Sequence, residues 1–292
     1  MILLHRREDF EMKDKKDLSV INCFATAFLA YFFTLPVHEL FHALTHLAYG
    51  NKVTCFSAGA VASEDLIDYS SLSYFHRIMV AGGSACILNI IIGIILMVIV
   101  FKVSMGPVMR VFMIQLMGAQ LSEGIGYFMI GGFFGAGDWG NVFSCFPDDP
   151  GFVTAMRIVI SIIGSLGFMG IFFLLSYTSY YFIKDPTDLK ERNLVGFKLH
   201  LTVLITGFTV GMIITALSPY EGLSLLIGLL YNMMWISFFW GFMFTGVMKV
   251  FIPQKSRFLY ELPGKPGPVL IAAAVVLILI NIFVFGPGIY FN

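Results

Sequence analysis

The sequence predicts an all-α, polytopic membrane protein with six to seven transmembrane helices, and two features of the 292-residue chain lead to this expectation. Apolar residues make up 58% of the chain and charged residues only 12%, with a mean hydropathy of +0.86. A soluble domain carries about twice that share of charged residues. Long apolar windows also recur along the chain, and each has about the 20 residues that a helix needs to cross a bilayer.

Seven apolar windows are long enough to cross the lipid bilayer as helices. They cover residues 18–37, 78–101, 108–134, 156–183, 199–217, 223–252 and 269–290. The first apolar pattern continues beyond residue 37 to Tyr49, where Gly50 and Asn51 are typical of a helix end. Such a helix is longer than the bilayer requires, so we expect it to tilt, protrude or break near Pro36, which lacks a backbone donor.

Basic residues predict the orientation of the chain, because cytoplasmic flanks retain Lys and Arg. With the N-terminus inside, only Lys52, Arg77 and Arg157 of the 18 basic residues fall outside. We therefore expect a cytoplasmic N-terminus, an external C-terminus and a location in the cell membrane. The formal net charge is zero, and no basic stripe indicates binding to nucleic acid.

The segment from His38 to His42 reads HELFH, which has the HExxH form of a metallopeptidase zinc motif. Residues four apart share one face of a helix, so His38 and His42 can bind a single Zn²⁺ through their imidazoles. Glu39 then lies beside the metal, where it can take a proton from a bound water. The motif predicts a zinc metalloendopeptidase at the edge of the bilayer.

A catalytic zinc ion requires a third protein ligand, and the chain contains more than one candidate. Asp138, in the segment GDWG, follows the outer end of the third span, level with the zinc motif, and is the preferred ligand. Glu123 lies within that span, where an ionisable side chain usually has a function, and is the alternative. His46 lies about 12 Å along the helix from His38, too far for an easy shared site, which favours a supporting or packing role over metal binding.

Three segments together resemble the site-2 protease family of intramembrane zinc metalloproteases. HELFH matches the HExxH element of that family, and residues 81–89, AGGSACILN, resemble its Gly-Pro-x-x-Asn segment without the proline. The segment GDW is similar to the Leu-Asp-Gly segment that supplies the ligand aspartate. The resemblance implies regulated intramembrane proteolysis of membrane-spanning or membrane-adjacent protein substrates, with Asp138 as the third ligand. Asn89 would contact the unwound substrate backbone, although a polar residue within a span can equally join two helices.

The expected organisation has three parts. A cytoplasmic tail covers residues 1–17, a metalloprotease core of three spans with HELFH and GDW covers 18–145, and four further transmembrane helices cover 146–292. Two alternatives stay open, a zinc-binding membrane protein that is not a peptidase and a zinc metalloprotease with Glu123 as ligand. Cys55 and Cys145 both fall in predicted outer loops, so a disulfide between them is conceivable.

Overall fold

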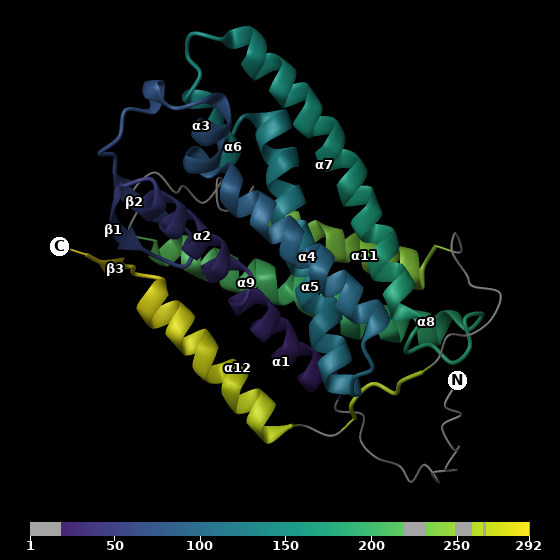
Figure 1. The fold of residues 1–292 in the computed structure, drawn as a ribbon. Helices are drawn as coiled ribbons and strands as arrows, with labels where there is room; N and C mark the ends of the chain where they lie inside the picture. Colours follow the sequence, from purple (N-terminus) through teal and green to yellow (C-terminus); the bar gives the residue numbers. More distant parts are fainter. Residues whose placement is uncertain (1–18, 219–231, 249–258, 265–266, 292) are drawn as a thin grey trace.

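The computed structural model describes residues 19–218, 232–248, 259–264 and 267–291, and this part of the chain is mostly helical (Figure 1). Within it, five helical stretches are long and apolar enough to cross a membrane. They are Ser19–Ala48, Tyr74–Lys102, Pro150–Ser179, Leu189–Leu217 and Pro268–Phe285. The predicted class, a helical membrane protein, is therefore present. The predicted tail over residues 1–17 and parts of the predicted span 223–252 lie outside the described residues.

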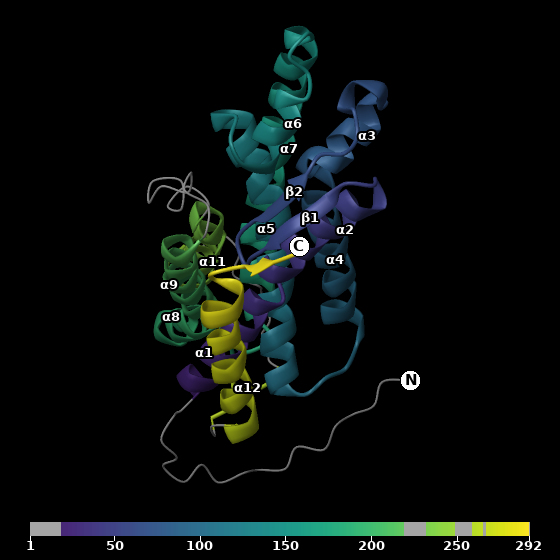
Figure 2. The ribbon, with the colours of Figure 1, turned by 90° about the vertical axis from the view of Figure 1, so that its left-hand side faces the viewer.

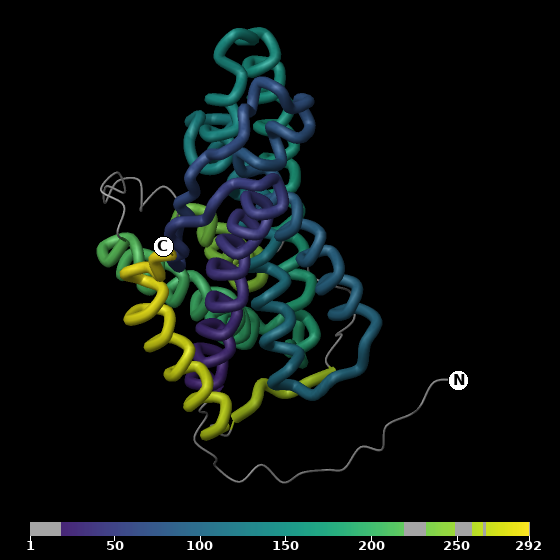
Figure 3. The backbone as a smooth tube through the Cα atoms, turned by 60° about the vertical axis from the view of Figure 1, so that its left-hand side comes forward, coloured from purple at the N-terminus to yellow at the C-terminus, as the bar shows by residue number. Residues whose placement is uncertain are grey.

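The first predicted span is broken where the proline suggested. Helix α1 (Ser19–Phe32) is followed by α2 (Leu35–Ala48), which continues in a similar direction (Figure 3). Pro36 occupies the first turn of α2, where a missing backbone donor has no cost. The Thr34 hydroxyl donates to the carbonyl of Ala30, 2.7 Å away, and thereby satisfies an acceptor at the break. Helix α2 ends at Ala48, and Gly50 takes a φ of 90°, as expected for a glycine after a helix.

The remaining helices form a bundle around α5. In chain order they are η1 (Tyr69–Ser71), α3 (Tyr74–Ile78), the π-helical turn η2 (Met79–Gly83), α4 (Ser84–Lys102), α5 (Pro107–Phe134), α6 (Gly137–Ser144), α7 (Pro150–Ser179), α8 (Leu189–Gly196), η3 (Phe197–Leu201), α9 (Thr202–Leu217), η4 (Met233–Trp235), α11 (Ile236–Gly246), α12 (Pro268–Ile280) and η6 (Asn281–Phe285). The core lies where α1, α4 and α7 pack on α5, around Ile114 and Met117.

Helix α5 is as long as the predicted third span, but it carries more polar residues than a helix that faces lipid. Its 28 residues suffice to cross a bilayer, but α5 is not among the five apolar candidates. It carries Arg110, Gln115, Gln120 and Glu123, which are all buried. Because other helices surround α5, this helix needs no continuous apolar face toward lipid.

A small antiparallel sheet departs from the all-α expectation. Strand β1 (Lys52–Phe56) lies between β2 (Val61–Glu64) and β3 (Ile289–Tyr290). Cys55 pairs with Tyr290, so the C-terminal end of the chain lies beside the segment that follows α2 (Figure 2). These strands were missed because each is too short to show a reliable alternating pattern. Cys55 and Cys145 are both free cysteines in the structure.

Candidate metal centre

Three side chains from two distant segments converge in the structure. His38 and His42 lie on α2, and Asp138 lies in the first turn of α6. The Oδ2 atom of Asp138 is 3.0 Å from Nε2 of His38 and 3.2 Å from Nε2 of His42, while the two Nε2 atoms are 3.1 Å apart. His38 and Asp138 are buried, and His42 is partly buried. This group can hold a metal ion.

The three candidate ligand atoms lie close enough to share one metal ion. Bonds of about 2.0–2.2 Å at tetrahedral angles place neighbouring ligand atoms about 3.3–3.6 Å apart. The observed triangle, with edges of 3.0, 3.1 and 3.2 Å, is slightly smaller than one face of such a tetrahedron. Two imidazole nitrogens and a carboxylate oxygen also form a donor set that suits Zn²⁺. The residues present therefore fit a metal ion that takes nitrogen and oxygen donors.

The charge state of Asp138 agrees with this role. Burial alone would raise the pKa of its carboxyl group, but His42 and His38 together hold that pKa well below its usual range. The carboxyl also lies in the first turn of α6, where the helix dipole favours a negative charge. Asp138 is therefore an anionic donor beside the two imidazoles.

Gly82 allows Asp138 to approach the start of α4. Gly82 has a φ of 153°, which favours glycine, and it interrupts the helical conformation within η2. A Cβ atom on Gly82 would lie 2.7 Å from the backbone oxygen of Asp138 and 2.8 Å from its Cβ. Through Gly82, the segment over residues 81–89 therefore lies against the backbone of Asp138, the third member of the ligand group.

Further contacts hold the ligands in place. The ring of Tyr127, on α5, stacks on the ring of His38 with centroids 5.0 Å apart and planes 8° apart. The Cys86 thiol, on α4, lies 3.3 Å from Oδ2 of Asp138 and donates to it. The sequence gives no signal that marks Cys86 or Tyr127 as a site residue. Tyr127 belongs to no motif, and Cys86 lies within the segment 81–89 at a position that matches no named residue of the family element, so the packing of α4 and α5 around the site reveals them.

A polar cavity opens over the metal group. It has a volume of about 330 Å³ and lies between α2, the turn before β2 and the start of α6. Its lining includes Glu39, His42, His46, Asp138 and Asn141. Glu39 is itself buried, and it lines a second cavity of about 40 Å³ as well. A carboxyl group that can act as a base is therefore present beside the ligands and at the wall of a cavity.

The other predicted site residues lie apart from the ligand triangle. Glu123 faces the small cavity with Glu39, and neither of its carboxyl oxygens has a hydrogen-bond partner within the described part of the chain. Asn89 is fully buried on α4 and is not among the residues that line the cavity above the ligands. His46 lines that cavity but is not in the ligand group, which consists of His38, His42 and Asp138 in the described residues.

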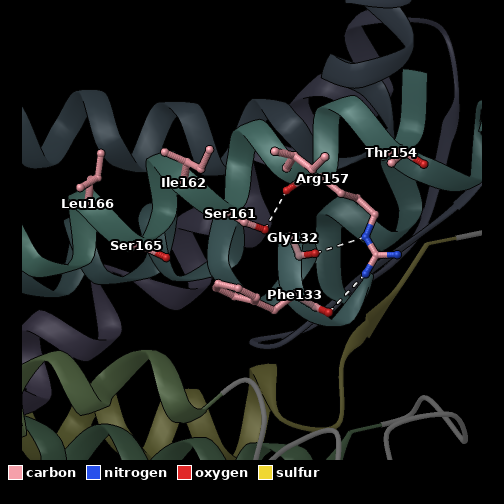
Figure 4. A pocket seen from close by; sticks show the side chains of 9 residues that line it. Gly132, Phe133, Thr154, Arg157, Ser161, Ile162, Ser165 and Leu166 are labelled. Atoms are coloured by element: carbon pink, nitrogen blue, oxygen red, sulfur yellow. Dashed lines mark hydrogen bonds between the residues drawn. The ribbon is translucent and has the colours of Figure 1, made fainter. Parts of the chain in front are cut away.

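A larger groove between α5 and α7 is unrelated to the metal group. It has a volume of about 610 Å³, and its lining includes Phe133, Ile162 and Leu166 (Figure 4). Its charged member, Arg157, donates to the backbone carbonyls of Gly132 and Phe133, each 3.2 Å away. Since this lining contains no acid or histidine, the candidate site lies in the smaller, polar cavity.

The fold and the ligand group together define a helical membrane protein with a buried site suited to a metal ion. Comparison of the chain with protein-family models, with curated proteins and with solved structures gives no match in any of the three.

Proposed function

We propose that the protein is an intramembrane zinc metalloendopeptidase, which hydrolyses peptide bonds of membrane-spanning or membrane-adjacent proteins in regulated intramembrane proteolysis. The observation that carries the proposal is the ligand triangle of His38, His42 and Asp138 with Glu39 on the wall of the same cavity. A metal site alone would serve many functions, but a carboxyl base beside an open coordination position is typical of hydrolysis.

The chain's own residues have distinct parts in the reaction. His38, His42 and Asp138 would hold Zn²⁺, which when bound would make water a stronger acid and polarise a carbonyl group. Glu39 accepts a proton from the attacking water at its carboxylate oxygen and then delivers that proton to the leaving amine nitrogen. Stacking of Tyr127 on His38 keeps the imidazole oriented during both steps.

The location of the cavity supports a substrate that comes from the membrane. Glu39 and His42 belong to the apolar stretch Ser19–Ala48, so a scissile bond reaches them close to the lipid region. A transmembrane helix protects its own peptide bonds, and the substrate must unwind locally before cleavage. We propose the cell membrane as the location, with the N-terminus cytoplasmic. Strand β3 pairs with β1 directly before the turn that lines the cavity, so the C-terminal end and the cavity lie on the same side, as an external C-terminus and an external site together require.

Metal analysis tests the ligand set. Purified protein should contain about one zinc per chain, and D138A should lose most of it. E123A is the matched control, because Glu123 is also a buried carboxyl group but lies outside the triangle. Zinc retained by D138A and lost by E123A would instead establish Glu123 as the third ligand.

Cleavage assays test the reaction. E39Q keeps the shape of the side chain and all three ligands, so it should retain zinc while cleavage of transmembrane peptides falls about 10²–10⁴-fold. Persistent cleavage by E39Q would refute the assigned base. If zinc-loaded wild-type protein cleaved none of a broad panel of membrane-spanning substrates, the alternative of a zinc-binding protein without peptidase activity would be favoured.

A further inference from the structure

His46 is bound on one side by groups from the loop and the sheet that follow α2. Its Nδ1 atom is 3.2 Å from the side-chain nitrogen of Asn51 and 3.2 Å from the hydroxyl of Ser63. The Asn51 amide has a fixed orientation, because its Oδ1 accepts a hydrogen bond from the backbone N–H of Leu66 at 3.0 Å. Its nitrogen must therefore be the atom that faces His46.

These contacts favour one form of the neutral imidazole. The amide nitrogen of Asn51 can only donate, and Nδ1 of His46 is one of three groups within 3.2–3.3 Å of it, beside the Tyr69 hydroxyl and Asp65 Oδ1. The Ser63 hydroxyl can donate to Nδ1 or accept from it. Only an unprotonated Nδ1 can accept from both Asn51 and Ser63, so the contacts favour a neutral ring with its proton on Nε2. Nε2 has no hydrogen-bond partner within the described residues.

The same ring faces the candidate active site. Glu39, His42 and His46 are spaced three and four residues apart, so they share one face of α2, and all three line the 330 Å³ cavity. His46 lies about 6 Å farther along the helix axis than His42. Side chains on a helix tilt toward its N-terminus, which brings the His46 ring back toward His42 and the ligands.

We propose that the Nε2–H group of His46 donates a hydrogen bond to the substrate oxygen on which negative charge develops during hydrolysis. This role rests on the proposed function. When water adds to the amide carbonyl, a C–O bond forms, the π-electron pair moves to the carbonyl oxygen, and Glu39 takes the water proton. His46 stabilises that oxygen without losing its own proton. The carbonyl then re-forms, the C–N bond breaks, and Glu39 protonates the leaving nitrogen.

Kinetics of three variants test the donor. H46A should lower kcat by about 10²–10³-fold, as expected for removal of a single donor to an oxyanion, while KM and zinc content change less than about threefold. H46Q places an amide N–H in a similar position and should recover at least about tenfold of the loss. H76A is the matched control, because His76 is an exposed histidine on α3. A kcat for H46A within twofold of wild type would overturn the proposal.

Two measurements that do not depend on turnover separate this proposal from the proposed function. Nitrogen-15 spectra of the metal-free protein should show the Nε2–H tautomer for the resonance that disappears in H46A, and an Nδ1–H tautomer would overturn the assignment. Zinc-loaded protein should also bind a phosphinic peptide, a mimic of the tetrahedral intermediate, about 10²-fold more tightly than H46A does. If the wild-type protein cleaved no peptide yet showed this difference, the proposed reaction would fail and the donor role of His46 would stand. Equal affinities would refute the donor role.

Discussion

Replacing Gly82 with alanine should weaken metal binding, although Gly82 is not a ligand. The added Cβ would lie 2.7 Å from the backbone oxygen of Asp138, whereas ordinary contacts begin near 3.4 Å. Asp138 must therefore move by about 0.7 Å, and metal sites tolerate displacements of only about 0.2 Å in ligand distance. We expect the dissociation constant for zinc to rise about 10–100-fold, which corresponds to about 1.4–2.8 kcal/mol.

A chelator-competition titration in detergent measures this change directly. G170A is the matched control, because a Cβ on Gly170 meets no atom within 4 Å. Both variants should remain monodisperse, with helical circular dichroism spectra like that of the parent. The φ of 153° at Gly82 adds strain of order 1–3 kcal/mol to G82A, so its melting temperature should also fall. A folded G82A that binds zinc within twofold of wild type would show that the close Gly82–Asp138 contact does not position the ligand.

Two further predictions concern contacts around the site. C86A removes the thiol that lies 3.3 Å from Oδ2 of Asp138 and should weaken zinc binding up to about tenfold. C86S retains a hydrogen-bond donor, so its zinc affinity should stay near that of the wild type. Equal zinc affinities for the two variants would refute this contribution. F291P removes the N–H that donates to the Thr54 carbonyl at 2.9 Å, so β3 should separate from β1 at a cost of about 0.5–1.5 kcal/mol. Cleavage should fall in F291P while its zinc content is unchanged. F291A keeps the backbone N–H and serves as the control. Loss of zinc in F291P would contradict the prediction.

The helical architecture could be predicted from the sequence because it depends on local properties. Long apolar windows predict most of the helices that are long and apolar enough to cross a membrane. The proline before the zinc motif correctly indicated where the first span breaks. Helix α5 is the instructive exception. Its window predicts a span like the other six. The buried Gln115, Gln120 and Glu123 show instead that α5 lies among other helices, and a window average cannot distinguish a helix that faces lipid from one that faces protein.

The ligand group could be predicted because two independent constraints agree. HELFH fixes two ligands by helical spacing alone, and the expected depth of Asp138 places a third acid at the same end of the bundle. The contacts of Asp138 with Gly82 and Cys86 could not be predicted, since they depend on how η2 and α4 approach α6. The hydrophobic pattern of one segment does not indicate how closely that segment packs against another.

The cavity has two kinds of wall, and they should contribute differently to function. Within the described residues, helices α2 and α6 supply the whole candidate ligand group, so the proposed metal binding would depend on helix packing. The opposite wall includes Gly59, Ala60 and Val61 in the turn and first residue of β2, and the backbone N–H of Ala58 in the same turn donates to the Phe285 carbonyl at 2.9 Å. This wall is therefore held by the C-terminal segment of the chain. Because no ligand lies on it, changes there should alter substrate affinity and turnover while zinc stays bound, which makes the two functions of the site separable by experiment.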